Sequence, residues 1–322
     1  MFLITGGVSE DIIKISKREN VITLSKDFTS LFTLINSMYK CEKIFLHGLF
    51  NFKIVFLLFL QPWLLKKSNW IVWGGDLYHY KFRKRNFKSD VQELVRRFVI
   101  KNFGAITTLV KGDYDLAKKW YGVKGDYYHG VYINPVNLEY LQKVKKIKKD
   151  NRNGINIQIG NSADPSNNHI QILDLLKKFK DENINIYAPL SYGNHDYAKE
   201  VVHYGKELFG NKFKPLLEFL NPEEYSKYLA SIDIAIFNHE RQQALGNIYA
   251  LLYLGKKIYI RSDISTWDYL KEQLNLNLFD IKEINNQNFV EFTNCNNLED
   301  NTEKIEKIFA ADYIRSVWKK IF

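Results

Sequence analysis

The residues with the clearest chemistry lie between positions 237 and 254, directly after an apolar run at 232–237. The run predicts a short buried strand, and the residues after it predict a polar loop and then a helix. A helix N-terminus offers unpaired N–H groups and a partial positive charge, and an arginine adds a fixed cation, so such a unit can bind an anion. The alternative is an ordinary capped helix in an α/β domain. The candidate residues are Arg241, Gln242, Gln243, Gly246 and Asn247.

A second anion-binding candidate follows the predicted strand at 155–159. Gly160, Asn161 and Ser162 can offer backbone N–H groups and short side-chain donors to a phosphate. A plain capping loop fits the same residue types equally well, because Ser and Asn are ordinary helix caps. Another predicted strand is followed by aromatic residues that can line a nucleoside pocket. The candidates there are Pro189, Tyr192 and Tyr197.

Two residues in the first half of the chain are candidate catalytic bases. Asp76 follows two glycines at a predicted strand end, where a carboxylate can act as general base or hold a sugar hydroxyl. A turn aspartate that binds its own backbone is the alternative for Asp76. His47 can also act as a base, because its unperturbed pKa lies near neutrality, although a structural hydrogen bond is the alternative for this residue. The other candidates at these strand ends are Gly74, Gly75, Lys111 and Asp113.

Apolar runs alternate with helical patterns along the chain, which predicts βαβ units and parallel sheets covered on both faces. The predicted strands are 1–5, 21–24, 43–47, 69–73, 105–110, 155–159, 185–189, 213–216, 232–237 and 257–260. The predicted helices are 28–39, 53–65, 90–102, 112–121, 168–180, 196–209, 223–230, 244–254 and 302–322. The chain is therefore expected to have an α/β fold of two Rossmann-like, doubly wound domains that face a cleft. Ligands in such sheets bind at the carboxyl ends of the strands, where the candidate clusters lie.

The chain of 322 residues is long enough for two domains of ordinary size. We expect an N-terminal domain at 1–150 and a C-terminal domain at 151–322, with a lysine-rich linker from about residue 136 to 153. The helix at the end of the chain is expected to pack back toward the first domain through Trp318 and Phe322. The chain contains only Cys41 and Cys295, which excludes a disulfide framework and favours a reducing compartment.

Positive charge is concentrated in the first half of the chain. Residues 1–153 hold 27 Lys and Arg against 13 Asp and Glu, whereas the remainder holds 19 against 23. A basic half with interleaved aromatic residues can bind an anionic membrane surface or a nucleic acid. No nucleic-acid-binding motif accompanies it, so the membrane surface is favoured and no nucleic acid partner is expected.

The sequence also excludes several kinds of protein. The most apolar segment, at 54–60, is seven residues long, whereas about 20 are needed to cross a bilayer. The N-terminus reads as a strand and not as a signal peptide. There is no Gly-x-x-x-x-Gly-Lys-[Ser/Thr] loop of nucleoside triphosphatases and no Gly-x-Gly-x-x-Gly of nicotinamide enzymes. No Asp-x-Asp pair is spaced for a metal-diphosphate clamp, so we expect no cofactor and no required metal.

Several of these motifs resemble glycosyltransferase family 56. The similar segments are Gly160-Asn161-Ser162-Ala163-Asp164 with the residues up to 170, and 237–246 with its Arg241-Gln242-Gln243. Trp73-Gly74-Gly75-Asp76-Leu77-Tyr78 and the segment 189–192 also fit the pattern of that family. Its members are bacterial TDP-N-acetylfucosamine:lipid II N-acetylfucosaminyltransferases of enterobacterial common antigen synthesis, also called 4-alpha-L-fucosyltransferases. The resemblance covers about residues 45–270.

The resemblance implies a GT-B fold in which the second domain holds a nucleotide-sugar donor. The acceptor, a polyprenyl-diphosphate-linked glycan, is then approached from the first domain, on the side of Gly74, Gly75, Lys111 and Asp113. The expected enzyme is a metal-independent glycosyltransferase of bacterial surface-polysaccharide synthesis. It would be cytoplasmic and peripherally associated with the inner face of the cell membrane, with an N-acetylated deoxy-sugar such as Fuc4NAc carried on dTDP or UDP. The rival interpretations are a non-catalytic nucleotide-sugar-binding protein and a nucleic-acid-binding protein.

Overall fold

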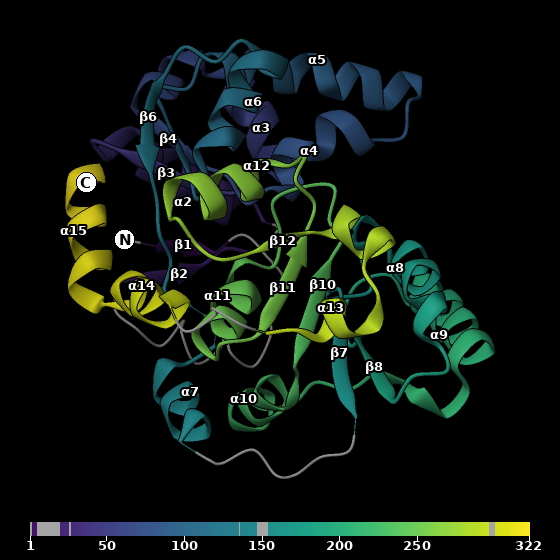
Figure 1. The fold of residues 1–322 in the computed structure, drawn as a ribbon. Helices are drawn as coiled ribbons and strands as arrows, with labels where there is room; N and C mark the ends of the chain where they lie inside the picture. Colours follow the sequence, from purple (N-terminus) through teal and green to yellow (C-terminus); the bar gives the residue numbers. More distant parts are fainter. Residues whose placement is uncertain (1, 5–19, 26, 135, 147–153, 296–299) are drawn as a thin grey trace. The chain divides into compact units, whose positions relative to one another are not determined.

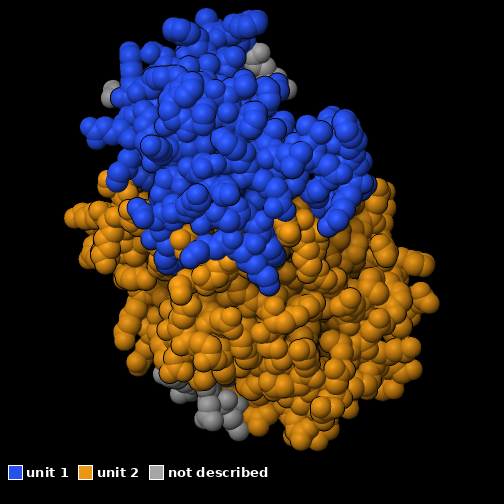
Figure 2. Space-filling view, turned by 90° about the horizontal axis from the view of Figure 1, so that it is seen from above, with its two compact units in different colours: residues 1–72, 83–107, 118–127 blue, residues 73–82, 108–117, 128–322 orange. Residues whose placement is uncertain are grey.

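Parallel strands alternate with helices throughout the part of the chain that the computed structural model describes, which is residues 2–4, 20–25, 27–134, 136–146, 154–295 and 300–322 (Figure 1). These residues cluster into two compact units, coloured separately in Figure 2. Unit 1 comprises residues 1–72, 83–107 and 118–127, and unit 2 comprises residues 73–82, 108–117 and 128–322. The predicted domain boundary near residue 150 lies at 147–153, outside the described residues, and stays a prediction.

The first half of the chain forms a four-stranded sheet in the order β3-β4-β5-β6, and β1 pairs with β2 in parallel. The pairings of β3 with β4 and of β4 with β5 are parallel, as the strand–helix alternation predicts. β6 was not predicted. The strands are β1 (Phe2–Ile4), β2 (Val21–Thr23), β3 (Ile44–His47), β4 (Ser68–Ile71), β5 (Ala105–Thr108) and β6 (Asp126–His129). The helices are α2 (Phe28–Lys40), α3 (Phe52–Leu60), η1 (Pro62–Lys67), α4 (Gly75–Phe82), α5 (Phe87–Lys101), α6 (Lys111–Tyr121) and α7 (Leu138–Lys145).

Unit 2 contains a six-stranded parallel sheet in the order β12-β11-β10-β7-β8-β9. The chain starts at β7, moves outward through β8 and β9, and then returns to the other side of β7 as β10. Such a reversal of strand order is a topological switch point, the usual place for a ligand in an open α/β sheet. The strands are β7 (Ile155–Ile159), β8 (Ile184–Pro189), β9 (Phe213–Leu216), β10 (Ile234–Phe237), β11 (Lys257–Ile260) and β12 (Phe279–Asp280).

Both faces of this sheet are covered, which explains why the central strand β10 is a continuous, fully buried apolar run. Along β10, Ile234 and Ile236 belong to one buried cluster together with residues of α8 and α9. Ala235 and Phe237 alternate with them and belong to a second cluster on the opposite face, with residues of α10 and α11 (Figure 1). The helices are α8 (His169–Leu176), α9 (His195–Phe209), α10 (Pro222–Ser231), α11 (Leu245–Tyr253), α12 (Ser265–Trp267), α13 (Phe289–Thr293), α14 (Asp300–Phe309) and α15 (Ala311–Ile321). The short turns of helix are η2 (Pro165–Asn167), η3 (Lys177–Phe179), η4 (Gly210–Lys212), η5 (Asp268–Gln273) and η6 (Ile281–Asn286).

Several expected elements differ from the structure, and the helix predicted at 53–65 is divided into α3 and η1. The single helix predicted at 302–322 is divided into α14 and α15, because Ala310 between them has an extended backbone. The indole Nε1 of Trp318 on α15 donates to the carbonyl of Val131 at 2.7 Å, and both residues belong to unit 2. The lysine-rich stretch predicted as a linker carries helix α7, whose first turn is capped by the side chain of Asn137.

A close backbone contact in unit 1 gives a test of this fold. A Cβ added at Gly104 would lie 2.0 Å from the carbonyl oxygen of Lys66, and the Gly104 amide donates to the carbonyl of Leu65 at 2.8 Å. We expect Gly104→Ala to lower the free energy of unfolding by about 1–3 kcal/mol, because backbone must move to admit the methyl group. Urea denaturation measures this change in the free energy of unfolding. Lys124→Ala, at an exposed position of the same unit, is the control, and its free energy of unfolding should lie within about 0.5 kcal/mol of the wild-type value. Equal stability of the two variants would contradict the close contact between Gly104 and Lys66.

Candidate functional site

Three loops of unit 2 follow neighbouring parallel strands and form one continuous surface. They lie at 160–168 after β7, at 190–194 after β8 and at 238–244 after β10, and β7 lies between β8 and β10 in the sheet. The first two loops pair through an isolated bridge between Ala163 and Gly193. The first and third are joined by Asn168, whose Nδ2 donates to the carbonyl of Asn238 at 3.1 Å. The predicted donor-side loops therefore meet at the carboxyl edge of the sheet.

Arg241 is fixed in the third loop by an ion pair with Asp164 of the first. Its NH2 lies 3.1 Å from Asp164 Oδ2, and its NH1 donates to the carbonyl of Gln242 at 3.3 Å. Burial opposes ionisation of Asp164, but hydrogen bonds from Ser166 and the charge of Arg241 outweigh that cost and hold the pKa of this carboxyl below its usual value. The pair is ionised near neutral pH, and a guanidinium carries five N–H donors, so most of them remain for a ligand.

Gln243 connects the same two loops through uncharged groups. Its Nε2 donates to Asn161 Oδ1 at 3.0 Å and approaches Ser162 Oγ at 3.4 Å. Its Oε1 accepts from Ser166 Oγ at 3.0 Å. Asn161 Nδ2 then donates to the hydroxyl of Tyr192 in the second loop at 3.0 Å. Five polar side chains from three loops thus hold one another in fixed orientations.

Gly160 stands where no other residue fits. Its φ is +61°, and an added Cβ would lie 2.4 Å from Nε2 of His169 and 2.8 Å from Oδ1 of Asn167. The Asn167 amide oxygen also accepts from the backbone N–H of Asn161 and lies 2.8 Å from Nε2 of His239. Burial lowers the pKa of His169 to about 4 and that of His239 to about 3, so both rings are neutral at pH 7. These buried side chains support the loop after β7 from the interior of unit 2.

The start of α11 presents backbone N–H groups next to these loops. The residue before it, Ala244, has a φ of +59°, and among the described residues no side chain caps this helix end. The first amides of α11 are therefore available to an anion, and the helix dipole favours negative charge there. Gly246 uses its carbonyl to accept from Asn134 Nδ2 at 3.0 Å, and the Asn247 side chain accepts from the hydroxyl of Tyr225 at 2.7 Å.

The Trp73–Tyr78 motif from the first half of the sequence lies against the Arg241 loop within unit 2. Gly74 has a φ of +79°, and a Cβ there would lie 2.6 Å from the carbonyl oxygen of Gln242. Asp76 is 2% exposed, and its Oδ1 accepts the backbone N–H groups of Trp73 and Leu77, each at 3.0 Å. These contacts favour a turn aspartate that binds its own backbone, and the role of Asp76 as a base stays a prediction.

Asp113 lies in a buried cluster beside the same motif. Its Oδ1 accepts from Ser265 Oγ at 2.7 Å, and the hydroxyl of Tyr78 is hydrogen-bonded to the cluster and to the backbone of Gln242. Burial raises the pKa of Asp113 to about 7, and the negative charge of Asp76 adds to the effect. The carboxyl is 2% exposed, so it supports the neighbouring residues and does not reach solvent.

The remaining predicted site residues are His47, Gly75, Lys111, Pro189 and Tyr197. His47, at the end of β3, is exposed and belongs to unit 1, whereas the three loops belong to unit 2. Gly75 starts α4, and Lys111 starts α6 with an exposed side chain. Pro189 is the buried last residue of β8. The Tyr197 hydroxyl accepts the backbone N–H of His169 at 3.0 Å, which makes it a brace of α8.

Sequence reasoning missed two kinds of residue at this edge of the sheet. Asp164 stands in the loop motif but was not chosen as a site residue, although a half-buried arginine requires a carboxylate partner. Phe219 lies in the segment between β9 and α10, and its ring stacks on that of Tyr192 with centroids 5.9 Å apart and planes at 13°. It is 75% exposed, as Tyr192 is 47% exposed, so the pair offers an aromatic surface to solvent. An apolar run (Leu217, Phe219, Leu220) inside a polar loop was the available signal.

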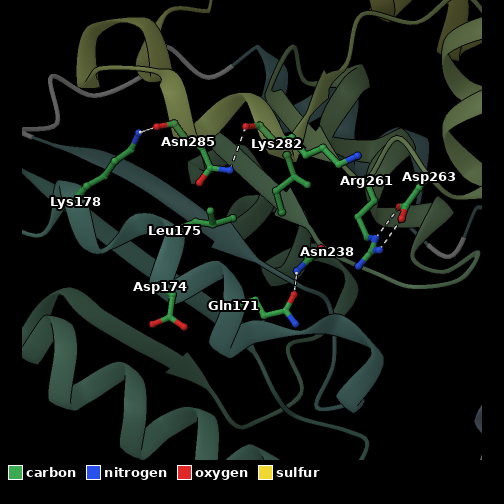
Figure 3. Close-up of a pocket in the computed structure, with 10 residues that line it drawn as sticks. Gln171, Asp174, Leu175, Lys178, Asn238, Arg261, Asp263, Lys282 and Asn285 are labelled. Carbon is green, nitrogen blue, oxygen red and sulfur yellow. Dashed lines mark hydrogen bonds and ion pairs between the residues drawn. The ribbon is translucent and has the colours of Figure 1, made fainter.

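A cavity of about 540 Å³ opens elsewhere in unit 2, between α8 and η6 (Figure 3). Three of its charged side chains already bind protein groups: Arg261 and Asp263 form two contacts of 2.8 and 2.7 Å, and Lys178 donates to backbone carbonyls. None of the predicted site residues is among those that line it. The lining residues are Gln171, Asp174, Leu175, Lys178, Asn238, Arg261, Asp263, Ile281, Lys282 and Asn285.

Comparison with known proteins identifies the class of protein. Residues 23–322 match the sequence model of a family described as 4-alpha-L-fucosyltransferase, glycosyl transferase group 56. The chain is also similar to the crystal structure of HepE from Anabaena in complex with UDP-glucose, with a TM-score of 0.69 and 10% identity over 99% of this chain and 91% of that one. A glycosyltransferase from Rickettsia africae has a TM-score of 0.65 and 13% identity, covering 99% and 87% of the two chains.

A third similar structure is WaaG, a glycosyltransferase involved in lipopolysaccharide biosynthesis, with a TM-score of 0.57 and 10% identity over 100% of this chain and 97% of that one. These neighbours have the GT-B fold, so the predicted fold class is confirmed. The predicted resemblance to family 56 is confirmed by the family match.

The buried carboxyl of Asp113 makes stability depend on pH. Its pKa is about 7 in the folded chain, above the ordinary value near which it titrates when unfolded, so the folded state holds the proton more tightly. The stability that the protonated Asp113 carboxyl contributes is fully present below about pH 4. The free energy of unfolding then falls by up to about 4 kcal/mol as pH rises to about 7. We expect Asp113→Asn to remove that loss, as measured by urea denaturation between pH 4 and 8. Asp115→Asn, at an exposed position of the same helix, should keep the wild-type profile, and a wild-type profile for Asp113→Asn would disprove the assignment.

Proposed function

We propose a specific transfer reaction for this chain, which belongs to the 4-alpha-L-fucosyltransferase family of glycosyl transferase group 56. The proposed reaction moves an N-acetylated deoxy-sugar such as Fuc4NAc from dTDP or UDP to a polyprenyl-diphosphate-linked oligosaccharide. Membership in the family makes it a glycosyltransferase that uses a nucleotide-sugar. The choice of sugar, nucleotide and lipid-linked acceptor, and the place of the reaction in bacterial surface-polysaccharide synthesis, are parts of the proposal.

The observation that carries the donor side is the convergence of Arg241, Gln243 and the start of α11 on the Gly160–Ser162 loop. When a sugar leaves its nucleotide, negative charge develops on the diphosphate, and fixed N–H dipoles with an oriented guanidinium stabilise that charge. These N–H groups are already held in place before the nucleotide-sugar binds, so little reorganisation is needed. In this proposal they neutralise the leaving group without a required metal.

The nucleoside is proposed to bind beside Tyr192. The stacked rings of Tyr192 and Phe219 are partly exposed, and aromatic faces of this kind bind the planar faces of bases. The Tyr192 hydroxyl also contacts Asn161, which ties this surface to the anion-binding loops. HepE was solved with UDP-glucose and with UDP, which supports a nucleotide-sugar donor for this chain.

The acceptor is proposed to approach from the side of Gly74 and Gly75, with Lys111 and Asp113 nearby in unit 2. Asp76 is the proposed base that activates the acceptor hydroxyl, and His47 is the second candidate. Closure of the site around both substrates would exclude water, so that the sugar is transferred and not hydrolysed.

The enzyme is proposed to work at the cytoplasmic face of the cell membrane, bound peripherally. None of the helices in the described part of the chain combines the length and hydrophobicity of a membrane-spanning segment. The excess of basic residues before position 153 supports attraction to anionic lipid headgroups, which carry the opposite charge.

Arg241 provides the direct test of the donor site. We expect Arg241→Ala to weaken dTDP or UDP binding about 10- to 100-fold, since a hydrogen-bonded charge is worth roughly 1.5–3 kcal/mol, and to slow transfer about 100-fold or more. Calorimetry measures the affinity, and release of nucleoside diphosphate measures transfer. Arg315→Ala removes an arginine that is largely exposed and paired with Asp312, and should change neither. With the fold verified by circular dichroism, near-normal affinity in Arg241→Ala would refute the role.

Asp76 tests the acceptor side separately. Asp76→Asn keeps an oxygen that can accept the N–H groups of Trp73 and Leu77 but removes the carboxylate base. We expect transfer to a polyprenyl-diphosphate-linked acceptor to fall about 100-fold or more, while nucleoside diphosphate affinity stays unchanged. His47→Gln, measured in parallel, distinguishes the second candidate. If Asp76→Asn transfers at the wild-type rate, Asp76 is a turn residue only.

A further inference from the structure

Helix α5 of unit 1 exposes an apolar stripe to solvent. A surface helix normally points its apolar residues at the core and its charges at solvent. In α5 Val99 and Ile100 are buried, but four other apolar residues are exposed: Phe87 is 87% exposed, Val91 45%, Leu94 68% and Phe98 41%. Their spacing of four, three and four residues places them on one stripe of the helix.

Two charged residues of α5 lie on its inner side. Glu93 is 3% exposed and Arg96 is 4% exposed. The Arg96 NH1 donates to the carbonyl of Leu49 at 2.7 Å, and Glu93 is 3.4 Å from the guanidinium of Arg97. The fold therefore satisfies the charges internally and leaves the apolar stripe to solvent, an arrangement that costs stability unless a partner covers the stripe.

The exposed stripe continues onto α3 and η1. The rings of Phe52, Phe56 and Phe59 follow one another at 6.4 and 6.3 Å, and Phe59 meets Phe98 of α5 edge-to-face at 5.3 Å. Phe56 and Leu60 are 45% and 56% exposed. Next along the chain Trp63 is 57% exposed, while its Nε1 donates to the hydroxyl of Tyr39. The two helices and the turn after them share one apolar face, which we call the α3–α5 face.

Basic residues flank this face. Residues 51–67 contain three lysines and no acidic residue, and residues 83–101 contain seven Lys and Arg against two acidic residues. Of those two, Glu93 is buried beside Arg97, and Asp90 is paired with Arg83 at 2.7 Å. Lys84, Arg85 and Lys88 are exposed next to Phe87.

We propose that the α3–α5 face of unit 1 docks on an anionic lipid bilayer, with its phenylalanine and leucine side chains among the acyl chains and its lysines and arginines at the headgroups. This deepens the proposed function and rests on it, since a polyprenyl-linked acceptor lies in a membrane. Apolar side chains flanked by Lys and Arg are the composition of interfacial membrane-binding surfaces. A second copy of the chain fits less well, because pairing two such faces brings like charges together without neutralising them.

Vesicle binding by the full-length protein tests the docking surface. We expect it to co-sediment with phosphatidylcholine vesicles that contain about 30% phosphatidylglycerol, and much less with pure phosphatidylcholine, because each basic residue near an anionic surface adds to the attraction. Leu94→Glu should weaken this binding about tenfold or more, because the apolar burial of one leucine is lost. Val290→Glu, which changes a 76% exposed apolar residue of unit 2 in the same way, is the matched control and should bind as wild type does.

The charged residues are tested by a second variant. Lys84→Glu/Arg85→Glu/Lys88→Glu should weaken binding to the anionic vesicles about 100-fold and leave weak binding to neutral vesicles unchanged. Wild-type binding by Leu94→Glu would overturn the proposal, and so would equal binding of the wild type to both kinds of vesicle. Light scattering without lipid adds a further check: a dimer that Leu94→Glu converts to monomer would assign the face to a second copy and overturn the membrane assignment.

Nucleoside diphosphate affinity, measured on the same variants without lipid, separates this proposal from the proposed function. Leu94→Glu with normal dTDP or UDP affinity but weak vesicle binding supports the docking surface. A wild type that binds anionic vesicles through this face but binds neither nucleotide would refute the donor site and leave the docking surface standing. A wild type that binds nucleotide but not vesicles would refute the docking surface alone.

Discussion

The ion pair between Arg241 and Asp164 is the interaction on which the candidate site depends. The Arg241 side chain is only 16% exposed, and a guanidinium at such a position must be neutralised to stay in the fold. Asp164 supplies the charge and ties the loop after β10 to the loop after β7. Because the pair is partly open to solvent, its value for stability is modest, and its main effect is to hold the remaining N–H donors of Arg241 in one orientation.

The sheet explains why these loops can meet at all. Parallel strands end at the same edge, and β7, β8 and β10 are neighbours although 75 residues separate the start of β10 from the end of β7. Close backbone approaches then set the distances between loops, and glycine is required at Gly193 against Ala163 and at Gly74 against Gln242. Buried neutral histidines and the Asp113 cluster support these contacts from within.

The fold could be predicted largely because its signals are local. The apolar run 234–237 coincides with β10, since a strand buried on both faces has no polar positions. β6 was missed because its residues, Asp-Tyr-Tyr-His, form no apolar run, and three of them are only half-buried. The outward stripe of α5 was also hidden, because a periodic pattern predicts an amphipathic helix without saying which face is buried.

The site was less predictable because it depends on contacts between distant segments. Loop positions such as Arg241 and Gln243 could be chosen from their chemistry, and the structure brings them to Asn161 and Asp164. No local pattern shows that the hydroxyl of Tyr197 is already used by the backbone of His169. Nor does spacing reveal that Gly74 approaches Gln242, since 168 residues separate them in the sequence.

In the proposed function these loops bind a diphosphate and not merely a nucleoside. Calorimetric titration of the wild-type protein with a nucleoside, its monophosphate and its diphosphate, in the dTDP and UDP series, tests it most directly. The Arg241 guanidinium and the amides at the start of α11 predict that the diphosphate binds about tenfold or more tighter than the monophosphate in at least one series. Equal affinity for all three compounds in both series would contradict the account.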